Sequence, residues 1–356
     1  MDSYAVQDRQ SLEFLWLELT GRCNLRCSHC YADSGPEQPL MDGMSLDDWV
    51  NALDEAAALG CRRVQFIGGE PTLYPGLPLL IEHARAVGFE YVCVYTNGTH
   101  ITEALKKVFL NQRVSLAFSV YGTNAAIHDQ VTLRRGSFAK TSAGLRWALD
   151  SGLPVSANII EMDVNSDGVP ETERMLREMG ARNVHVDRLR GLGRGADERP
   201  AQPRLRELCG RCGDRKVCVS SGGAIFPCVF ARFADLGSMK SGGIAGAFNS
   251  LRLNDFRDAL VATHPWLAAR RAASTRSMHA NESLACGPET DPGPCDPEKP
   301  TICGPETDPG PCDPEKPTIC GPETDPGPCP PEEPVPDCAP ERPACRPTDC
   351  SPETTA

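Results

Sequence analysis

Short β-forming segments alternate with amphipathic helical segments along the first half of this chain. Strands are predicted over residues 12–19, 63–67, 91–95, 114–120, 155–160 and 183–186. Helices are predicted over residues 45–59, 79–87, 103–109, 138–151 and 171–179, with Ser45 as a suitable N-cap for the first. Six strands separated by helices predict an α/β fold, a partial (β/α)6 barrel of the TIM type. Such a fold places its chemistry in the loops after the C-terminal ends of the strands.

The net charge of the chain is concentrated near its C-terminus. Of 48 acidic and 36 basic residues, 16 acidic and 4 basic ones lie in residues 286–356, which leaves 32 of each sign in residues 1–285. A neutral body gives no electrostatic footprint for duplex nucleic acid or an anionic membrane, so neither is an expected partner.

No segment predicts membrane insertion or export. The longest apolar run, residues 91–95, is far shorter than the roughly 18 residues of a spanning helix. The N-terminus lacks a cationic segment followed by an apolar one, so no signal peptide is expected. We therefore predict a cytoplasmic location, where thiols stay reduced and clustered cysteines are more often metal ligands than disulfides.

Residues 286–356 form a low-complexity tail that repeats itself. The segment CGPETDPGPCDPEKPTI at 286–302 recurs unchanged at 303–319, and a degraded third copy begins at Cys320. A 17-residue period without an apolar face builds no solenoid core, so a disordered Pro/Cys-rich segment is expected. Three roles stay open for it: a donor of metal ligands, a metal- or partner-binding arm, and a solvated spacer.

Three cysteines follow the first predicted strand, in the sequence CNLRCSHC. Cys23, Cys27 and Cys30 lie within eight residues, at the catalytic end of the expected barrel. A structural zinc site normally has four protein ligands, and no fourth cysteine follows nearby. On a [4Fe–4S] cubane, three cysteines leave one iron open to a small molecule. Structural zinc and three unrelated core cysteines are the alternatives.

CNLRCSHC resembles the CxxxCxxC signature of the radical SAM superfamily, with His29 at the position of its usual aromatic residue. The resemblance covers about residues 12–190. It implies a [4Fe–4S] cluster held by Cys23, Cys27 and Cys30, with S-adenosylmethionine chelating the open iron. One-electron cleavage of S-adenosylmethionine would then give a 5′-deoxyadenosyl radical, which takes a hydrogen atom from the substrate.

Polar residues at the ends of later strands resemble the cofactor pocket of the same family. Gly68-Gly69-Glu70-Pro71 looks like its GGE motif, in which the carboxylate holds the methionine ammonium of the cofactor. Alone, Gly-Gly-Glu is a common turn. The other predicted cofactor-binding residues are Thr96, Asn97, Ser119 and Asn158. The fourth strand of the family often ends in Ser-x-Asp-Gly, and here Tyr121 replaces the Asp.

A second cysteine group lies at Cys209, Cys212, Cys218 and Cys228. Its spacing fits a four-thiolate zinc site or an auxiliary [4Fe–4S] cluster. Residues 219–228 resemble the start of a SPASM or twitch extension, which follows many radical SAM cores. The predicted domains are a radical SAM core over 1–190, a linker over 191–204, an auxiliary cluster domain over 205–280 and the tail over 286–356.

Three further predictions concern single segments. Residues 250–272 are expected to form a helix, and Cys61 and Cys93 are expected to be buried core residues. Gly191-Leu-Gly-Arg-Gly195 lacks the GxGxxG spacing and is rejected as a dinucleotide-binding loop.

The resemblance implies a radical SAM enzyme, most consistent with one that matures a ribosomally synthesised peptide by forming a cross-link or inverting a carbon centre. Its partners would be a peptide substrate and a reductant such as ferredoxin or flavodoxin. One alternative is a radical SAM dehydrogenase or epimerase of a sugar or aminoglycoside. The other is a non-catalytic Fe–S or zinc protein.

Overall fold

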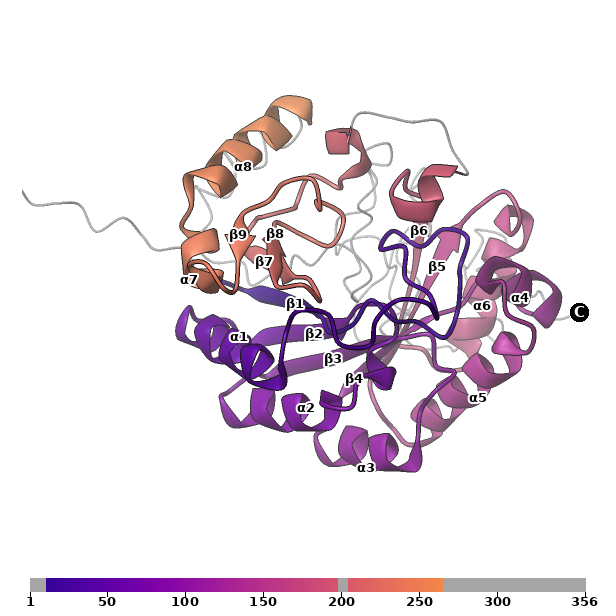
Figure 1. Ribbon diagram of the computed structural model, residues 1–356. Coiled ribbons are helices and arrows are strands. Elements are labelled where there is room, and N and C mark those ends of the chain that lie inside the picture. The colour runs from indigo at the N-terminus through magenta and orange to yellow at the C-terminus, as the bar shows by residue number, and fades with distance from the viewer. Residues whose placement is uncertain (1–10, 198–203, 265–356) are drawn as a thin grey trace, which may run out of the picture. The chain divides into compact units, whose positions relative to one another are not determined.

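A nine-stranded sheet with the order β6-β5-β4-β3-β2-β1-β7-β8-β9 organises the protein. The computed structural model describes residues 11–197 and 204–264. The first six strands are parallel neighbours in chain order, connected by helices that lie outside the sheet (Figure 1). The predicted α/β partial barrel is therefore confirmed.

All six predicted barrel strands are present, with ends shifted by at most two residues. The strands are β1 Phe14–Glu18, β2 Arg63–Ile67, β3 Tyr91–Thr96, β4 Ser115–Ser119, β5 Val155–Glu161, β6 Asn183–Arg188, β7 Lys216–Val219, β8 Ala224–Phe226 and β9 Gly237–Ser238. The α-helices are α1 Leu46–Ala58, α2 Leu77–Ala86, α3 Glu103–Asn111, α4 Ala125–Thr132, α5 Ser137–Asp150, α6 Val169–Glu178, α7 Gly243–Phe248 and α8 Leu251–Thr263. Short 3-10 helices are η1 Pro71–Leu73, η2 Ser166–Gly168, η3 Gly193–Asp197 and η4 Arg204–Glu207.

Local sequence explains the predicted helices and one that was missed. Ser45 and Asp48 form a capping box at the start of α1, whose buried side includes Trp49 and Leu53. Helix α4 was not predicted because its eight residues are too few for a clear apolar period. Its N-cap is Asn124, whose side chain accepts from the Ile127 backbone N–H.

The barrel sheet has two chemically different faces. Every second side chain along the strands is apolar and packs against the helices. Leu17 on β1 and its neighbour Phe66 on β2 are examples. The opposite alternating set faces the barrel interior and is largely polar or aromatic; it includes Trp16, Gln65, Tyr95, Ser119, Asn158 and His185. The interior face of the sheet thus carries groups that can bind a polar ligand.

The segment after the barrel extends the same sheet instead of forming a separate one. Strand β7 pairs in parallel with β1, so that Trp16 lies opposite Cys218, and β8 and β9 add antiparallel strands (Figure 1). The predicted domain boundaries stay predictions. The tail over 286–356 and the end of the helix predicted over 250–272 lie outside the described residues. Among the described helices, none has the length and apolar content to cross a membrane.

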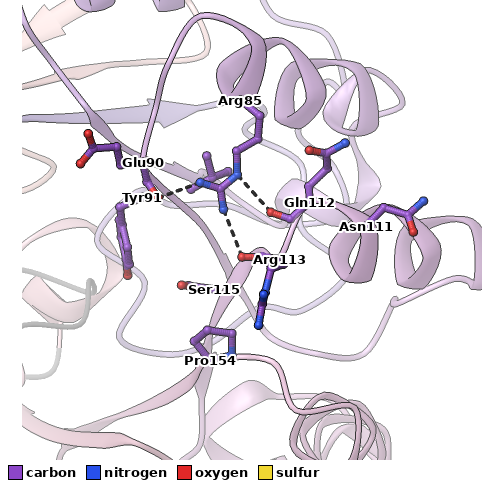
Figure 2. Close-up of a pocket in the computed structure, with 9 residues that line it drawn as sticks. Arg85, Glu90, Tyr91, Asn111, Gln112, Arg113, Ser115 and Pro154 are labelled. Atoms are coloured by element: carbon purple, nitrogen blue, oxygen red, sulfur yellow. Dashed lines mark hydrogen bonds between the residues drawn. The ribbon is translucent and has the colours of Figure 1, made fainter.

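At the N-terminal ends of the strands, Arg85 connects two strand starts. Its guanidinium donates to the backbone carbonyls of Phe89, Glu90, Gln112 and Arg113, at 2.7–3.1 Å. Figure 2 shows the last three of these hydrogen bonds. These contacts border an open pocket of about 510 Å³. Because the pocket lies at the end opposite the expected chemistry, we assign Arg85 to structure.

Replacing Arg85 with Met should lower the free energy of unfolding by about 1–3 kcal/mol, because four carbonyls lose a charged donor. Urea unfolding measures the change. Arg182→Met is the matched control, since Arg182 is exposed at the same end of the barrel, and it should change stability by less than about 0.5 kcal/mol. Equal decreases in the free energy of unfolding in both variants would contradict the structural role assigned to Arg85.

Candidate active site

The cysteine loop after β1 is held against the end of β2 by direct backbone contact. The Gly69 N–H donates to the Thr20 carbonyl (2.7 Å), and the Glu70 N–H donates to the Arg22 carbonyl (2.9 Å). A Cβ atom on Gly69 would collide with the Arg22 carbonyl, and Gly68 has a φ of +131°. The two glycines therefore permit the approach that positions Cys23, the next residue after Arg22.

Glu70 joins the ends of β2 and β3. Its buried carboxylate accepts from the backbone N–H and hydroxyl of Thr72 (3.1 and 2.6 Å), the Thr96 hydroxyl (2.6 Å) and the Asn97 N–H (2.8 Å). Pro71 begins η1, which brings the Thr72 N–H to this carboxylate. Burial raises the pKa of Glu70 above its usual value, although all four hydrogen bonds oppose that rise. The predicted residues Glu70, Thr96 and Asn97 are thus brought together.

Asn97 also reaches the first cysteine. Its side-chain amide lies 3.8 Å from the Cys23 sulfur and donates to the Asn24 side chain at 2.8 Å. The Leu25 N–H approaches the same sulfur at 3.4 Å. N–H groups aimed at a cysteine sulfur stabilise a metal-bound thiolate.

The segment rejected as a dinucleotide loop instead fastens the cysteine loop. Arg194 donates from its backbone to the Cys30 carbonyl (3.0 Å) and from its side chain to the carbonyls of Cys27 (2.9 Å) and Ser34 (2.8 Å). Gly193 lies against the Cys30 carbonyl, where a Cβ would collide. Nothing in the local sequence signalled this role, because the contact joins residues more than 160 positions apart.

Ser119 and Asn158 lie on the interior face of the sheet, and His29 lies beside Tyr121. The Ser119 hydroxyl donates to the Tyr95 hydroxyl at 3.2 Å, and Asn158 lies opposite Ser119 on β5. The buried Asn158 amide nitrogen and the His29 Nε2 atom have no hydrogen-bond partner among the described residues. The His29 ring contacts Tyr121 edge to face, with centroids 4.9 Å apart. Their binding roles stay predictions.

Behind Tyr121 lies a buried histidine that the sequence analysis did not select. His128 accepts from the Tyr121 backbone N–H through Nδ1 (3.3 Å), and its ring lies 5.4 Å from that of Tyr121. Loss of solvation lowers the pKa of His128 to about 4. His128 therefore supports Tyr121 as a neutral imidazole.

The depressed pKa makes stability pH-dependent. Between about pH 6.5 and 4, the unfolded chain binds a proton at His128 that the folded chain does not, so stability falls as pH decreases. The free energy of unfolding should decrease between pH 7 and pH 5. His128→Gln, which keeps a hydrogen-bond acceptor, should make that decrease smaller by about 2 kcal/mol. Urea unfolding at both pH values tests this. An equal decrease in the free energy of unfolding between pH 7 and pH 5 in the variant and the unchanged protein would exclude His128 as the cause.

In the second cysteine group, Cys209, Cys212 and Cys228 are buried together. The Cys212 and Cys228 sulfurs are 2.7 Å apart, and Cys212 hydrogen-bonds with Cys209. That hydrogen bond, assisted by nearby Arg190, lowers the pKa of Cys209 to about 6 against the opposing effect of burial. Cys218 lies on β7, opposite Phe226, with Tyr31 and Arg232 among its electrostatic neighbours. Ligation by any of the four stays a prediction.

Arg190, two residues after β6, is used inside the fold. It is buried and pairs with Asp187 at 2.7 Å, and its Cζ lies 4.6 Å from the centre of the Phe230 ring. The predictions that Cys61 and Cys93 are buried are confirmed.

Residues 17–179, from β1 to the end of α6, match the family model of the Radical SAM superfamily. This chain carries a radical SAM domain. The matched segment includes Cys23, Cys27, Cys30 and Glu70. The resemblance based on CNLRCSHC is thereby confirmed, and the cofactors of such a domain are a [4Fe–4S] cluster and S-adenosylmethionine.

Curated relatives match over more than the radical SAM domain. The antilisterial bacteriocin subtilosin biosynthesis protein AlbA of Bacillus subtilis is 26% identical over 266 residues, 65% of this chain and 58% of AlbA. The AdoMet-dependent heme synthase of Methanosarcina barkeri is 30% identical over 187 residues, 52% of this chain and 53% of the synthase. The chain spans little more than half the length of these relatives.

A solved structure shares the fold. Streptococcus suis SuiB, crystallised with precursor peptide SuiA, aligns with a TM-score of 0.59 at 13% identity, covering 70% of this chain and 67% of SuiB. Residues 17–179 are less than half of this chain, so the shared fold continues beyond the radical SAM domain.

The cysteine loop fits an Fe–S cluster. Burial is the main cause that raises the pKa of Cys23 to about 12, followed by charge repulsion from Glu70 and Cys30. Burial, followed by charge repulsion from Cys23 and Cys30, also raises the pKa of Cys27. Thiols that disfavour each other's ionisation become good ligands once cationic iron lies between them. Among the described residues, no three His, Cys, Asp or Glu side chains converge on a single ion. That geometry is not required of cubane ligands, which bind different iron atoms.

Anaerobic reconstitution should give about eight irons per chain, four for each cluster. Cys27→Ala and Cys212→Ala should each lose about four, whereas Cys61→Ala, with a buried cysteine outside both groups, should lose none. Iron analysis and absorbance spectra provide the measurement. Full iron content in the Cys212 variant would exclude the second site.

A chain ending at Ala285 should also hold about eight irons if residues 209–228 bind the second cluster without the tail. A decrease to about four would make the tail a ligand donor.

Proposed function

We propose that this chain is a radical SAM enzyme that modifies a ribosomally made peptide. The observation that carries the proposal is the contact between two segments at one end of the barrel: the three-cysteine loop and the Glu70 carboxylate with its Thr96 and Asn97 donors. The proposed cluster ligands and the proposed acceptor of the cofactor ammonium are thereby adjacent.

The proposed site residues have different chemical roles. Cys23, Cys27 and Cys30 would hold the cluster, while Glu70 would accept hydrogen bonds from the cofactor ammonium, whose charge offsets the cost of burying the carboxylate. When bound, the cluster and S-adenosylmethionine supply a 5′-deoxyadenosyl radical that removes a hydrogen atom from the substrate. Arg194 would keep the loop in place during this chemistry through its three hydrogen bonds to loop carbonyls.

Residues on the interior face of the sheet would bind the substrate backbone. The unpartnered Asn158 amide and His29 Nε2 are buried polar groups, which are costly unless a ligand supplies a partner. Tyr95 adds a half-buried aromatic side chain on the same face of the sheet. Amide donors beside aromatic rings suit the alternating polar and apolar groups of a peptide.

Two similar proteins support the choice of a peptide substrate. AlbA is a bacteriocin biosynthesis protein, and SuiB was crystallised with a precursor peptide.

Cys209, Cys212 and Cys228 would hold an auxiliary cluster for electron transfer or substrate binding, with Cys218 or another group as a fourth ligand. A low-potential donor such as ferredoxin or flavodoxin would supply electrons. The many cysteines outside the tail agree with a reducing, cytoplasmic location.

Anaerobic protein given S-adenosylmethionine, a low-potential reductant and candidate peptides should release 5′-deoxyadenosine with a peptide, and Cys27→Ala should reduce this to background. Chromatography quantifies the nucleoside. Turnover with an aminoglycoside or another sugar but with no peptide would favour the sugar alternative. No reductive cleavage under any condition would favour a non-catalytic metalloprotein.

A further inference from the structure

The turn between α4 and α5 exposes a leucine in an unfavourable backbone conformation. Leu133 has a φ of +52° and a ψ of +33°, in the left-handed region, and it is 60% exposed. Stability alone favours Gly or Asn at such a position, because a bulky side chain is costly there and this one gains little from burial. Residues held in strained backbone conformations cluster at functional sites.

Asp129 fixes the shape of this turn. Its carboxylate accepts hydrogen bonds from the Gly136 N–H (2.6 Å), the Ser137 hydroxyl (2.8 Å) and the Phe138 N–H (2.8 Å). These contacts tie the end of α4 to the start of α5, and the two helices pack against each other (Figure 1). A surface that is already fixed loses less conformational entropy when a partner binds.

The turn and α5 form a cationic surface on a neutral body. Arg134 and Arg135 follow Leu133, and we term these three residues the leucine–arginine turn. All three are exposed, and neither arginine has an ion-pair partner within the described part of the chain. Residues 130–149 contain four basic residues and no acidic one, whereas residues 1–285 hold 32 of each sign. The charge of this surface therefore favours an acidic partner.

The leucine–arginine turn lies directly beside the cysteine loop. The Thr132 carbonyl accepts from the Arg26 N–H at 3.2 Å, and the Val131 carbonyl accepts from the Ser28 N–H at 3.1 Å. These two hydrogen bonds flank Cys27, whose side chain packs against the apolar cluster that contains Val131. One residue and one hydrogen bond thus connect the turn to Arg26, the residue before Cys27.

The predicted cofactor-binding residues contact a different cysteine. The Asn97 side chain approaches Cys23, and the Asn97 N–H donates to the Glu70 carboxylate. Cys27 is instead the cysteine beside α4. A partner on the leucine–arginine turn would therefore approach the loop beside Cys27 and would leave Glu70 free for the cofactor.

We propose that the leucine–arginine turn is the docking surface for an acidic one-electron carrier protein, which reduces the cluster held by Cys23, Cys27 and Cys30. The inference rests on the proposed function and locates the binding of its reductant. Leu133 becomes buried at the centre of the contact, and the two arginines pair with carboxylates of the carrier. The short path from the turn to Cys27 keeps the distance of electron transfer small.

The carrier step moves one electron and no atoms. A reduced carrier, such as the hydroquinone form of a flavodoxin, gives one electron to the oxidised cluster and becomes a semiquinone. No bond of this chain forms or breaks, and no proton or leaving group moves. The same electron is consumed when the S–C5′ bond of S-adenosylmethionine is cleaved, so each cleavage requires one such transfer.

Docking is tested by titrating the reconstituted full-length chain with oxidised flavodoxin and measuring the dissociation constant by calorimetry. Arg134→Gln/Arg135→Gln should weaken binding about tenfold at low salt, because two exposed ion pairs are lost. High salt should weaken binding to the unchanged protein more than to this variant. Lys107→Gln/Arg182→Gln removes the same charge from exposed residues elsewhere and should not alter binding.

Leu133→Asn separates docking from folding. Asn adopts the left-handed conformation more readily than Leu, so this variant should unfold at a higher urea concentration. It should nevertheless bind flavodoxin severalfold more weakly, because the exposed apolar group is lost. A variant that is less stable, or that binds flavodoxin as well as the unchanged protein does, would contradict docking on Leu133.

The electron step is followed by anaerobic stopped-flow mixing of flavodoxin hydroquinone with the oxidised, reconstituted chain. Flavin absorbance should show a transfer rate about tenfold lower in the Arg134/Arg135 variant than in the Lys107/Arg182 control. Dithionite, a small reductant that needs no docking, should reduce all three proteins alike. Slow reduction of the Arg134/Arg135 variant by both reductants would show that the turn supports the cluster itself, and would overturn the inference.

A reduced acidic ferredoxin provides the same measurement with the other class of carrier. Transfer rates that do not depend on the two arginines with either carrier would overturn the inference and leave the proposed function standing. So would reduction by dithionite but by neither carrier. The proposed function itself fails only if no reductant, dithionite included, supports release of 5′-deoxyadenosine.

Discussion

The backbone contact between Gly68-Gly69 and residues 20–22 determines where the chemistry of this barrel can take place. Strand β2 ends so close to the chain ahead of Cys23 that only a residue without a side chain fits at Gly69. Two backbone hydrogen bonds join the loops, and the next residue, Glu70, binds four donors. Movement of either loop would therefore displace both the thiols and the carboxylate.

This arrangement depends on a sheet whose two faces differ in chemistry. The face toward the helices is aliphatic and aromatic and supplies the apolar burial that stabilises the fold. The face toward the interior carries amide, hydroxyl and aromatic groups such as Asn158, Ser119 and Tyr95. Stability and ligand binding are thus assigned to opposite sides of the same strands, so the interior can remain polar.

The segment after β6 completes the site from the other side. Arg194 binds the carbonyls of the cysteine loop, and Arg232 pairs with Glu18 at the end of β1, where Tyr31 also donates to the carboxylate at 3.3 Å. Strand β7 continues the sheet beside β1. The two cysteine groups therefore share one scaffold.

Residues close in sequence determined much of this protein by themselves. The alternation of apolar strands and amphipathic helices predicted all six barrel strands, because strand and helix periods depend on neighbouring side chains. The CNLRCSHC motif predicted the family from its own spacing, and the CxxC pair in the second group predicted that Cys209 and Cys212 would lie together.

Only the tertiary structure decided the contacts between distant segments. It showed that Glu70 binds Thr96 and Asn97, that Arg194 fastens a loop more than 160 residues earlier, and that His128 supports Tyr121. It also placed β7 beside β1, and His264 beside η4. Each contact joins segments whose meeting depends on sheet order and helix packing, and these are set by burial of the whole chain rather than by any local pattern.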